Sequence, residues 1–146
     1  MLVSIVDFNK IMPLVNTIEP AYSSRSACIQ LVKKKLLSAQ VVHPDEMPSN
    51  IITMNSVVTL RQTAPILTYS IRLVYPTFDN VRENRISLFS ALGVAIFLGK
   101  IGEELTYTNW KGEKRIQILD IPFQPEANGN YVSAKTYGMD NSPLLF

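Results

Sequence analysis

Two ladders of apolar residues lie before residue 41, and each has the spacing of one face of an α-helix. The first ladder is formed by Phe8, Ile11, Val15 and Ile18, and the second by Ile29, Val32, Leu36 and Ala39. Steps of three and four residues bring side chains to one stripe of a helix, where they can pack against a partner helix. We therefore expect a short antiparallel helical hairpin, a small coiled coil, over residues 1–42.

Capping residues and prolines indicate where these helices begin and end. Asp7 is a suitable N-cap for the first helix, and Ser23 or Ser24 for the second. Pro20 should end the first helix, because proline has no N–H to donate and disfavours a helical residue before it. Pro13 lies inside the first ladder, so we expect this helix either to kink or to begin later.

The pattern changes after residue 42. Residues 43–50 contain two prolines and no apolar period, and we interpret them as a linker. Four later runs either alternate or are rich in β-branched residues, as strands do: 57–61, 68–75, 104–108 and 115–121. Gly112 permits a hairpin turn between the last two.

One short helix is expected among these strands. Ser90 is a natural N-cap, the apolar run 91–98 forms the body, and Gly99 is expected just past its end. Residues 51–128 are thus predicted to be an α+β unit, an antiparallel sheet folded over one short helix. The tail 129–146 has no repeating pattern and should be frayed, unless its apolar end, 144–146, docks on its own domain or on a second copy.

Composition narrows the classes of function. The chain has 146 residues, of which 47% are hydrophobic and 18% charged, enough for one packed domain with a small appendage. The formal net charge of +2 gives little reason to expect a nucleic-acid or membrane partner, and direct contact with nucleic acid should be weak at most. Cys28 and His43 are the sole residues of their types, which excludes an intramolecular disulfide, a cysteine-based zinc cluster and most histidine-based metal sites. We expect no metal or cofactor.

The sequence also lacks the marks of export. The first residues have neither the basic segment nor the long apolar stretch of a signal peptide. The longest apolar run, 91–98, is far shorter than the roughly 20 residues of a membrane-spanning helix. We expect a cytoplasmic protein, where a single thiol is ordinary.

No catalytic constellation is evident. The chain has no glycine-rich phosphate loop, and its single histidine lies in the expected linker. Glu103 and Glu104 are adjacent on or beside a strand, where neighbouring side chains point to opposite faces, so they are poorly placed as an acid–base pair. Asp45 and Glu46 are interpreted as solvated loop residues. The run Lys33–Lys35 is interpreted as a solvated helix face, with a basic binding patch as the alternative.

Short motifs then follow one another in a fixed order, at 44–48, 52–56, 73–76, 86–87, 90–95, 98–102 and 123–127. In this order they resemble the GreA/GreB superfamily of transcript cleavage factors, and within it the regulators of nucleoside diphosphate kinase. The resemblance implies an FK506-binding-protein-like (FKBP-like) fold from about residue 51. It also implies binding to RNA polymerase at the rim of the secondary channel, in competition with other channel regulators.

Gre factors carry a long coiled coil with an acidic pair at its tip that helps polymerase to hold a catalytic Mg²⁺. This chain departs from that pattern, because its expected hairpin legs reach only about 16 to 25 Å. The turn 16–25 contains a single carboxylate, Glu19, where a metal-holding tip needs two. We therefore expect no transcript cleavage.

The leading hypothesis is a non-enzymatic regulator that binds RNA polymerase as a monomer or weak dimer, and that affects nucleoside diphosphate kinase indirectly, through transcription. If this chain has inherited the polymerase contacts of the family, the candidate contact surface lies around Ser90, Ala91, Leu92 and Gly93, with the hairpin beside it. Capping and core packing of the short helix would explain the same four residues. The alternatives are an active Gre-like cleavage and elongation factor or an FKBP-like prolyl isomerase. The isomerase would need a pocket lined by aromatic residues, for which the candidates are Tyr75, Phe78, Phe89, Tyr107 and Trp110.

Overall fold

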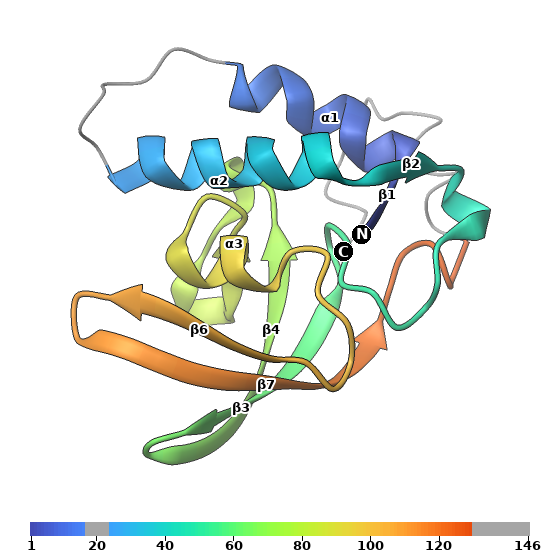
Figure 1. Cartoon of the computed structure of the whole chain (residues 1–146). Coiled ribbons are helices and arrows are strands. Elements are labelled where there is room, and N and C mark those ends of the chain that lie inside the picture. The colour runs from blue at the N-terminus through green and yellow to red at the C-terminus, as the bar shows by residue number, and fades with distance from the viewer. Residues whose placement is uncertain (17–23, 130–146) are drawn as a thin grey trace.

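The computed structural model describes residues 1–16 and 24–129, in which two helices lie along one side of a curled β-sheet (Figure 1). The helices are α1 (Ile5–Val15), α2 (Ser24–Ser38) and α3 (Ala91–Ile96). The strands are β1 (Leu2–Ser4), β2 (Gln40–Val42), β3 (Val57–Thr63), β4 (Ile66–Val74), β5 (Arg85–Ser87), β6 (Glu104–Asn109) and β7 (Gly112–Phe123). No helix in the described ranges is long and apolar enough to cross a membrane.

The main sheet has five strands in the order β5-β4-β3-β7-β6. The fold is therefore α+β, as predicted, and the four strands expected from the sequence correspond to β3, β4, β6 and β7. The sheet is not purely antiparallel, because β5 pairs with β4 in parallel. A separate two-stranded parallel sheet joins β1 to β2 beside the helices. The sequence did not reveal β1, β2 or β5, which have only three residues each.

The first helix begins earlier than expected. Ser4, not Asp7, is its N-cap, and the Ser4 hydroxyl accepts a hydrogen bond from the backbone N–H of Asp7 at 3.1 Å. Asp7 lies in the first turn and is buried. Pro13 stays inside the helix, so the predicted later start is wrong. Ser24 begins α2, whereas Ser23 lies outside the described residues.

The short helix ends earlier than expected. Its last residue is Ile96, and Leu98 rather than Gly99 adopts the left-handed backbone conformation (φ +65°) that is common just past the end of a helix. The chain turns here because Leu98 donates its N–H to the carbonyl of Ile52 and the Gly99 carbonyl accepts from Ile52. Gly99 is needed for space, since a Cβ there would lie 2.9 Å from the backbone carbonyl oxygen of Ile96.

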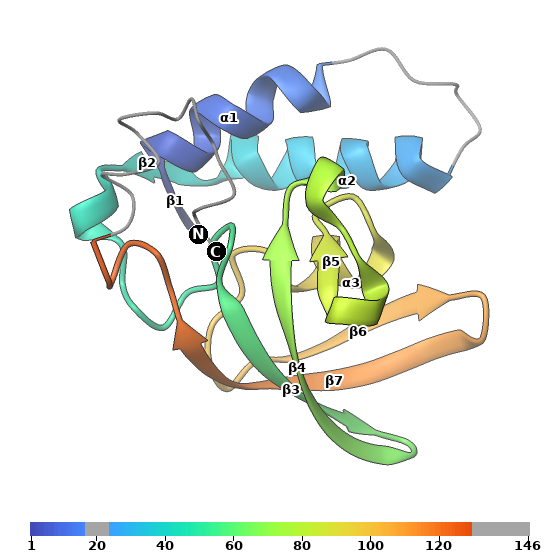
Figure 2. The ribbon, with the colours of Figure 1, turned by 180° about the vertical axis from the view of Figure 1, so that it is seen from behind.

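One hydrophobic core joins the helices to the sheet. The inward residues of both apolar ladders are buried, as the spacing predicted: Ile11, Val15, Ile29, Val32 and Leu36. They belong to the same cluster as the buried residues of β3, β7 and α3. Figure 2 shows from behind that α1 and α2 lie over the same side of the sheet. Ile18, at the end of the first ladder, lies outside the described residues.

A lysine joins α2 to α3. The Lys35 ammonium donates hydrogen bonds to the carbonyls of Val94 at 2.7 Å, Phe97 at 2.8 Å and Ala95 at 3.3 Å. The last carbonyls of a helix have no partner within the helix and carry its partial negative charge, so a cation there is stabilising. The predicted solvated face is therefore wrong for Lys35, although Lys34 is exposed.

Burial lowers the pKa of Lys35 to about 8, and the carboxylate of Glu103 partly opposes this effect. At neutral pH most molecules still carry the charged ammonium, because its pKa lies above 7. The link between α2 and α3 is therefore an ion–dipole contact that ties the helices to the sheet unit.

Replacing Lys35 should measure the strength of this link. We expect Lys35→Met to lower the free energy of unfolding by about 1–3 kcal/mol, because the carbonyls at the end of α3 lose a charged donor. Lys34→Met is the matched control and should change it by less than about 0.5 kcal/mol, since that side chain is exposed. Urea unfolding followed by circular dichroism gives both values, and equal effects would contradict the assigned role.

Candidate functional site

The four residues predicted as a contact surface form the first turn of α3. The Ser90 hydroxyl accepts a hydrogen bond from the N–H of Gly93 at 3.0 Å and donates one to the carbonyl of Ser87 at 2.8 Å. It is thus the N-cap that the sequence indicated. A Cβ at Gly93 would lie only 2.0 Å from the Ser87 carbonyl oxygen, so any other residue would displace this turn.

This turn lies next to the second helix. Ala91 and Leu92 are half-buried, and Leu92 packs against the core. At the start of α2, the Arg25 guanidinium lies 5.4 Å from the ring centroid of Phe89, the residue before Ser90, which is a cation–π contact. The structure therefore brings α2 and the first turn of α3 onto one surface. The predicted hairpin tip, with Glu19, lies outside the described residues.

A buried acidic cluster, which sequence reasoning missed, joins the two ends of the described chain. The Asp7 carboxylate accepts a hydrogen bond from the N–H of Met54 at 3.2 Å and a long one from the Tyr75 hydroxyl at 3.4 Å. The Thr53 hydroxyl donates to the Glu126 carboxylate at 2.7 Å. Asp7 and Glu126 are both buried, and nothing in their local sequence indicated that they would meet.

The environment of this cluster favours protonated acids. Burial, with the nearby Glu126 carboxylate, raises the pKa of Asp7 to about 8. Burial also raises the pKa of Glu126, while the hydrogen bond from Thr53 opposes the shift. Lys10 lies over the ring of Tyr75 and slightly favours a charged Asp7. Near neutral pH, the cluster therefore holds a proton that the unfolded chain would release.

The motif at 123–127 contacts the motifs at 44–48 and 52–56. The Gln124 amide donates hydrogen bonds to the carbonyls of Pro48 and Ile51, both at 2.8 Å. Glu126 binds Thr53, as described above. The segment after β7 therefore closes the fold against the segment that precedes β3.

Other candidate residues have local roles. The Glu103 carboxylate accepts from the N–H of Lys100 at 2.7 Å and closes a turn, apart from Glu104. The Asp45 carboxylate and the His43 ring lie 2.6 Å apart beside a short 3-10 helix. Among the described residues, no group of three or more histidine, cysteine, aspartate or glutamate side chains could hold a metal ion.

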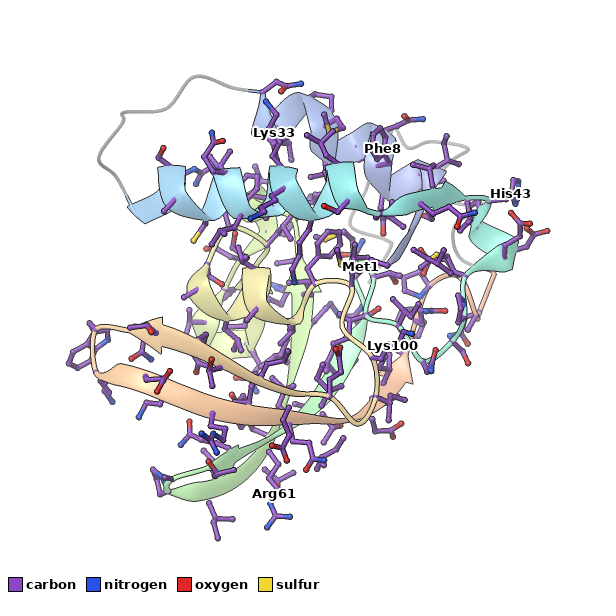
Figure 3. All side chains as sticks on the ribbon, in the orientation of Figure 1. Met1, Phe8, Lys33, His43, Arg61 and Lys100 are labelled. Atoms are coloured by element: carbon purple, nitrogen blue, oxygen red, sulfur yellow. The ribbon has the colours of Figure 1, made fainter. Side chains whose placement is uncertain are left out.

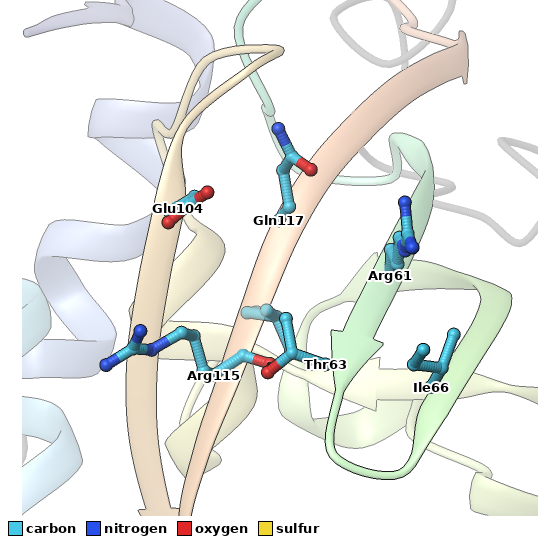
Figure 4. Close-up of a pocket in the computed structure, with 7 residues that line it drawn as sticks. Arg61, Thr63, Ile66, Glu104, Arg115 and Gln117 are labelled. Carbon is cyan, nitrogen blue, oxygen red and sulfur yellow. The ribbon is translucent and has the colours of Figure 1, made fainter.

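The aromatic residues considered for an isomerase pocket point in different directions. Trp110 is 88% exposed at the turn between β6 and β7, whereas Tyr75 reaches the buried Asp7. A cavity of about 250 Å³ on the outer face of the sheet is lined by polar and aliphatic side chains, among them Arg61, Arg115 and Gln117 (Figure 4). Arg61 points away from the helices on this face (Figure 3). This cavity contains no aromatic side chain.

Comparison with known proteins identifies the family. Residues 47–123 match the family model "Transcription elongation factor, GreA/GreB, C-term", and the chain belongs to this family. It is 29% identical over 115 residues to the Regulator of nucleoside diphosphate kinase of Escherichia coli (strain K12), which covers 78% of this chain and 84% of that protein. The resemblance seen in the motifs is thereby confirmed.

A further sequence relative and a solved structure similar to this chain are both named as transcription elongation factors. Transcription elongation factor GreA of Syntrophobacter fumaroxidans is 30% identical over 93 residues, which cover 64% of this chain and 60% of that protein. The solved structure "Prokaryotic transcription elongation factor GreA/GreB from Nitrosomonas europaea" superimposes with a TM-score of 0.71 at 24% identity. That alignment covers 84% of this chain and 98% of the other, so the two proteins share a fold.

The acidic cluster makes stability depend on pH. The pKa of Asp7 is about 8 in the folded chain, whereas its ordinary value is 3.8. The stability that comes from the raised pKa is therefore fully present below about pH 4, where Asp7 is protonated in both states. It is lost as the pH rises towards 8, because the unfolded chain gives up the proton first. We expect Asp7→Asn to reduce this dependence, leaving the part due to Glu126, and to be more stable than the parent by about 1 kcal/mol or more near pH 8.

Urea unfolding near pH 5 and near pH 8 tests this expectation. Asp79→Asn is the matched control, because Asp79 is exposed and should leave the pH dependence of the parent unchanged. If the parent and Asp7→Asn had the same pH slope, the pKa of Asp7 would not be raised by folding, and the expectation would be wrong.

Proposed function

We propose that this chain is a non-catalytic regulator of transcription that binds RNA polymerase near its secondary channel. Membership of the GreA/GreB family supports a role in transcription. The similarity to a Regulator of nucleoside diphosphate kinase extends over most of both chains, which favours that type of regulator. Control of nucleoside diphosphate kinase would then follow from altered transcription.

The proposal assigns separate roles to two parts of the chain. Residues 1–42 form the helical hairpin and residues 51–128 the FKBP-like domain, with 43–50 as the linker and 129–146 as a tail. The domain docks on polymerase and the hairpin lies at the channel entrance. In this position the hairpin competes with other factors that use the channel.

The observation that carries the proposal is the surface shared by α2 and α3. Ser90, Ala91, Leu92 and Gly93 lie in one turn whose shape is set by the Ser90 cap and by the close approach at Gly93. Lys35 ties α2 to the other end of the same helix. A surface that is already ordered loses little conformational entropy on binding, which suits it to docking.

The hairpin argues against transcript cleavage. The helices α1 and α2 have 11 and 15 residues, which at about 1.5 Å per residue gives lengths of roughly 16 and 22 Å. The sequence between them, residues 16–23, contains one carboxylate, Glu19. A single acid is a poor partner for a catalytic Mg²⁺, which is usually held by more than one oxygen ligand from its site.

The test is binding of the purified chain to core RNA polymerase, with a cleavage assay on a backtracked complex beside it. We expect binding that GreB displaces, and no cleavage above the intrinsic rate of polymerase. Cleavage that depends on Mg²⁺ and is lost in Glu19→Ala would show an active Gre-like factor. Absence of binding would contradict the proposal as a whole.

A pair of variants locates the surface. Ala91→Glu places a charge on the first residue of α3, where the helix dipole tolerates an acid, and should weaken polymerase binding by about tenfold. Thr68→Glu adds the same charge on the exposed outer face of β4 and should leave the affinity within about twofold. Equal affinities for both variants would place the contact elsewhere on the chain.

A further inference from the structure

The strand β6 forms one edge of the main sheet, and half of its backbone groups face away from its neighbour. The turn 110–111 makes Asn109 and Gly112 a hydrogen-bonded pair, and the pairing alternates along the ladder. The bond from the N–H of Ile118 to the Glu103 carbonyl agrees with this alternation. The N–H and C=O groups of Glu104, Thr106 and Thr108 therefore point away from β7.

This edge has few of the features that keep sheet edges from pairing. The register between β6 and β7 runs from Glu104 to Asn109 without a bulge. The strand contains no proline, and its one charge is Glu104 at the end. Proteins commonly block an exposed edge with such features, so their absence indicates an edge that can accept another strand. The opposite edge, β5, has only three residues.

An apolar groove runs along the helix side of this edge. It lies between α2, α3 and β6, has a volume of about 380 Å³, and is lined in part by Leu31, Ala95 and Leu105. Leu31 is 52% exposed, although it is a large apolar side chain. Lys34 also lines the groove and makes no ion pair with a described residue.

A second hollow lies on the outer side of the same strand. It has a volume of about 210 Å³ and is lined by Glu104, Leu105, Thr106 and Arg115. Arg115 extends from β7 across β6 (Figure 4). The Arg115 guanidinium has no acidic partner within ion-pair distance among the described residues. Each side of the free edge thus has a cation, Lys34 or Arg115, that forms no ion pair within the part of the chain that the structure describes.

We propose that the β6 edge binds an extended acidic segment of another protein as an added strand. The backbone of the segment bonds to Glu104, Thr106 and Thr108, as in strand addition to other sheet edges. Alternate side chains of a strand point to opposite faces, so apolar residues enter the groove and acidic residues face Arg115. Lys34, on the groove side, selects further against a basic segment.

A second copy of this chain is a poorer occupant. Pairing of β6 with its own copy would bring together the same two cations, Lys34 and Arg115, from both molecules. The edge strand offers only Glu104 to meet them. An acidic segment pairs with Arg115 and brings no further cation next to Lys34. This proposal does not depend on polymerase binding.

The test uses a fluorescent peptide of alternating valine and aspartate residues, with a valine–lysine peptide as the charge control. Binding is measured with the full chain by fluorescence anisotropy, and NMR hydrogen exchange reports on each backbone N–H. We expect the acidic peptide to bind at least about tenfold more tightly than the basic one. It should slow exchange at Thr106 and Thr108, whose N–H groups face the edge.

Two variants separate an added strand from a merely electrostatic contact. Thr106→Pro removes an N–H that β7 does not use, so the sheet should fold while peptide binding falls at least about tenfold. Thr106→Val keeps the N–H and is the matched control, with an affinity within about twofold of the parent. Arg115→Gln should weaken binding severalfold without altering the exchange pattern, because the aspartates face this side of the strand.

Other outcomes would overturn the proposal. Equal binding by Thr106→Pro and Thr106→Val, with circular dichroism showing both folded, would exclude strand addition. No binding of the acidic peptide, or no protection at Thr106 and Thr108, would do the same. A dimer of the parent in sedimentation that Thr106→Pro abolishes would assign the edge to a second copy instead.

Discussion

The contact between Lys35 and the end of α3 determines how the helices sit on this fold. A six-residue helix cannot satisfy its own last carbonyls, and here a side chain from α2 satisfies three carbonyls at its end. This requirement holds α2 close to α3 and β6. The shared core, the surface at Ser90 to Gly93 and the groove beside β6 all depend on that position.

The cluster of Asp7 and Glu126 lowers stability, whereas the contact of Lys35 with α3 raises it. Burying two acids is costly, and the cost is reduced by protonation and by the hydrogen bonds from Met54, Tyr75 and Thr53. These hydrogen bonds form in one relative position of α1 and the sheet, so the cluster fixes how α1 packs on the sheet. Apolar contacts along α1 are less specific, because they tolerate small shifts of the helix.

Features of this fold that depend on local sequence were predicted, and those that depend on distant partners were not. The four longer strands, the Ser90 cap and the turn at Gly112 follow from residues close together in the chain. The end of α3 was mispredicted because Ile52, more than 40 residues earlier, pairs with the chain at Leu98. The same reason hid the role of Lys35 and the meeting of Asp7 with Glu126, since no local pattern marks a side chain whose partner is remote.

The motifs that identify the family serve mainly to build this fold. Ser90 and Gly93 shape the start of α3, and Gln124 ties the end of β7 to the carbonyls of Pro48 and Ile51. These residues help to specify the fold of this chain, and a fold by itself leaves the activity undetermined. None of these contacts involves the free edge of β6. An added strand contacts mainly backbone there, so that edge can change its side chains, and with them its partner, without cost to the fold.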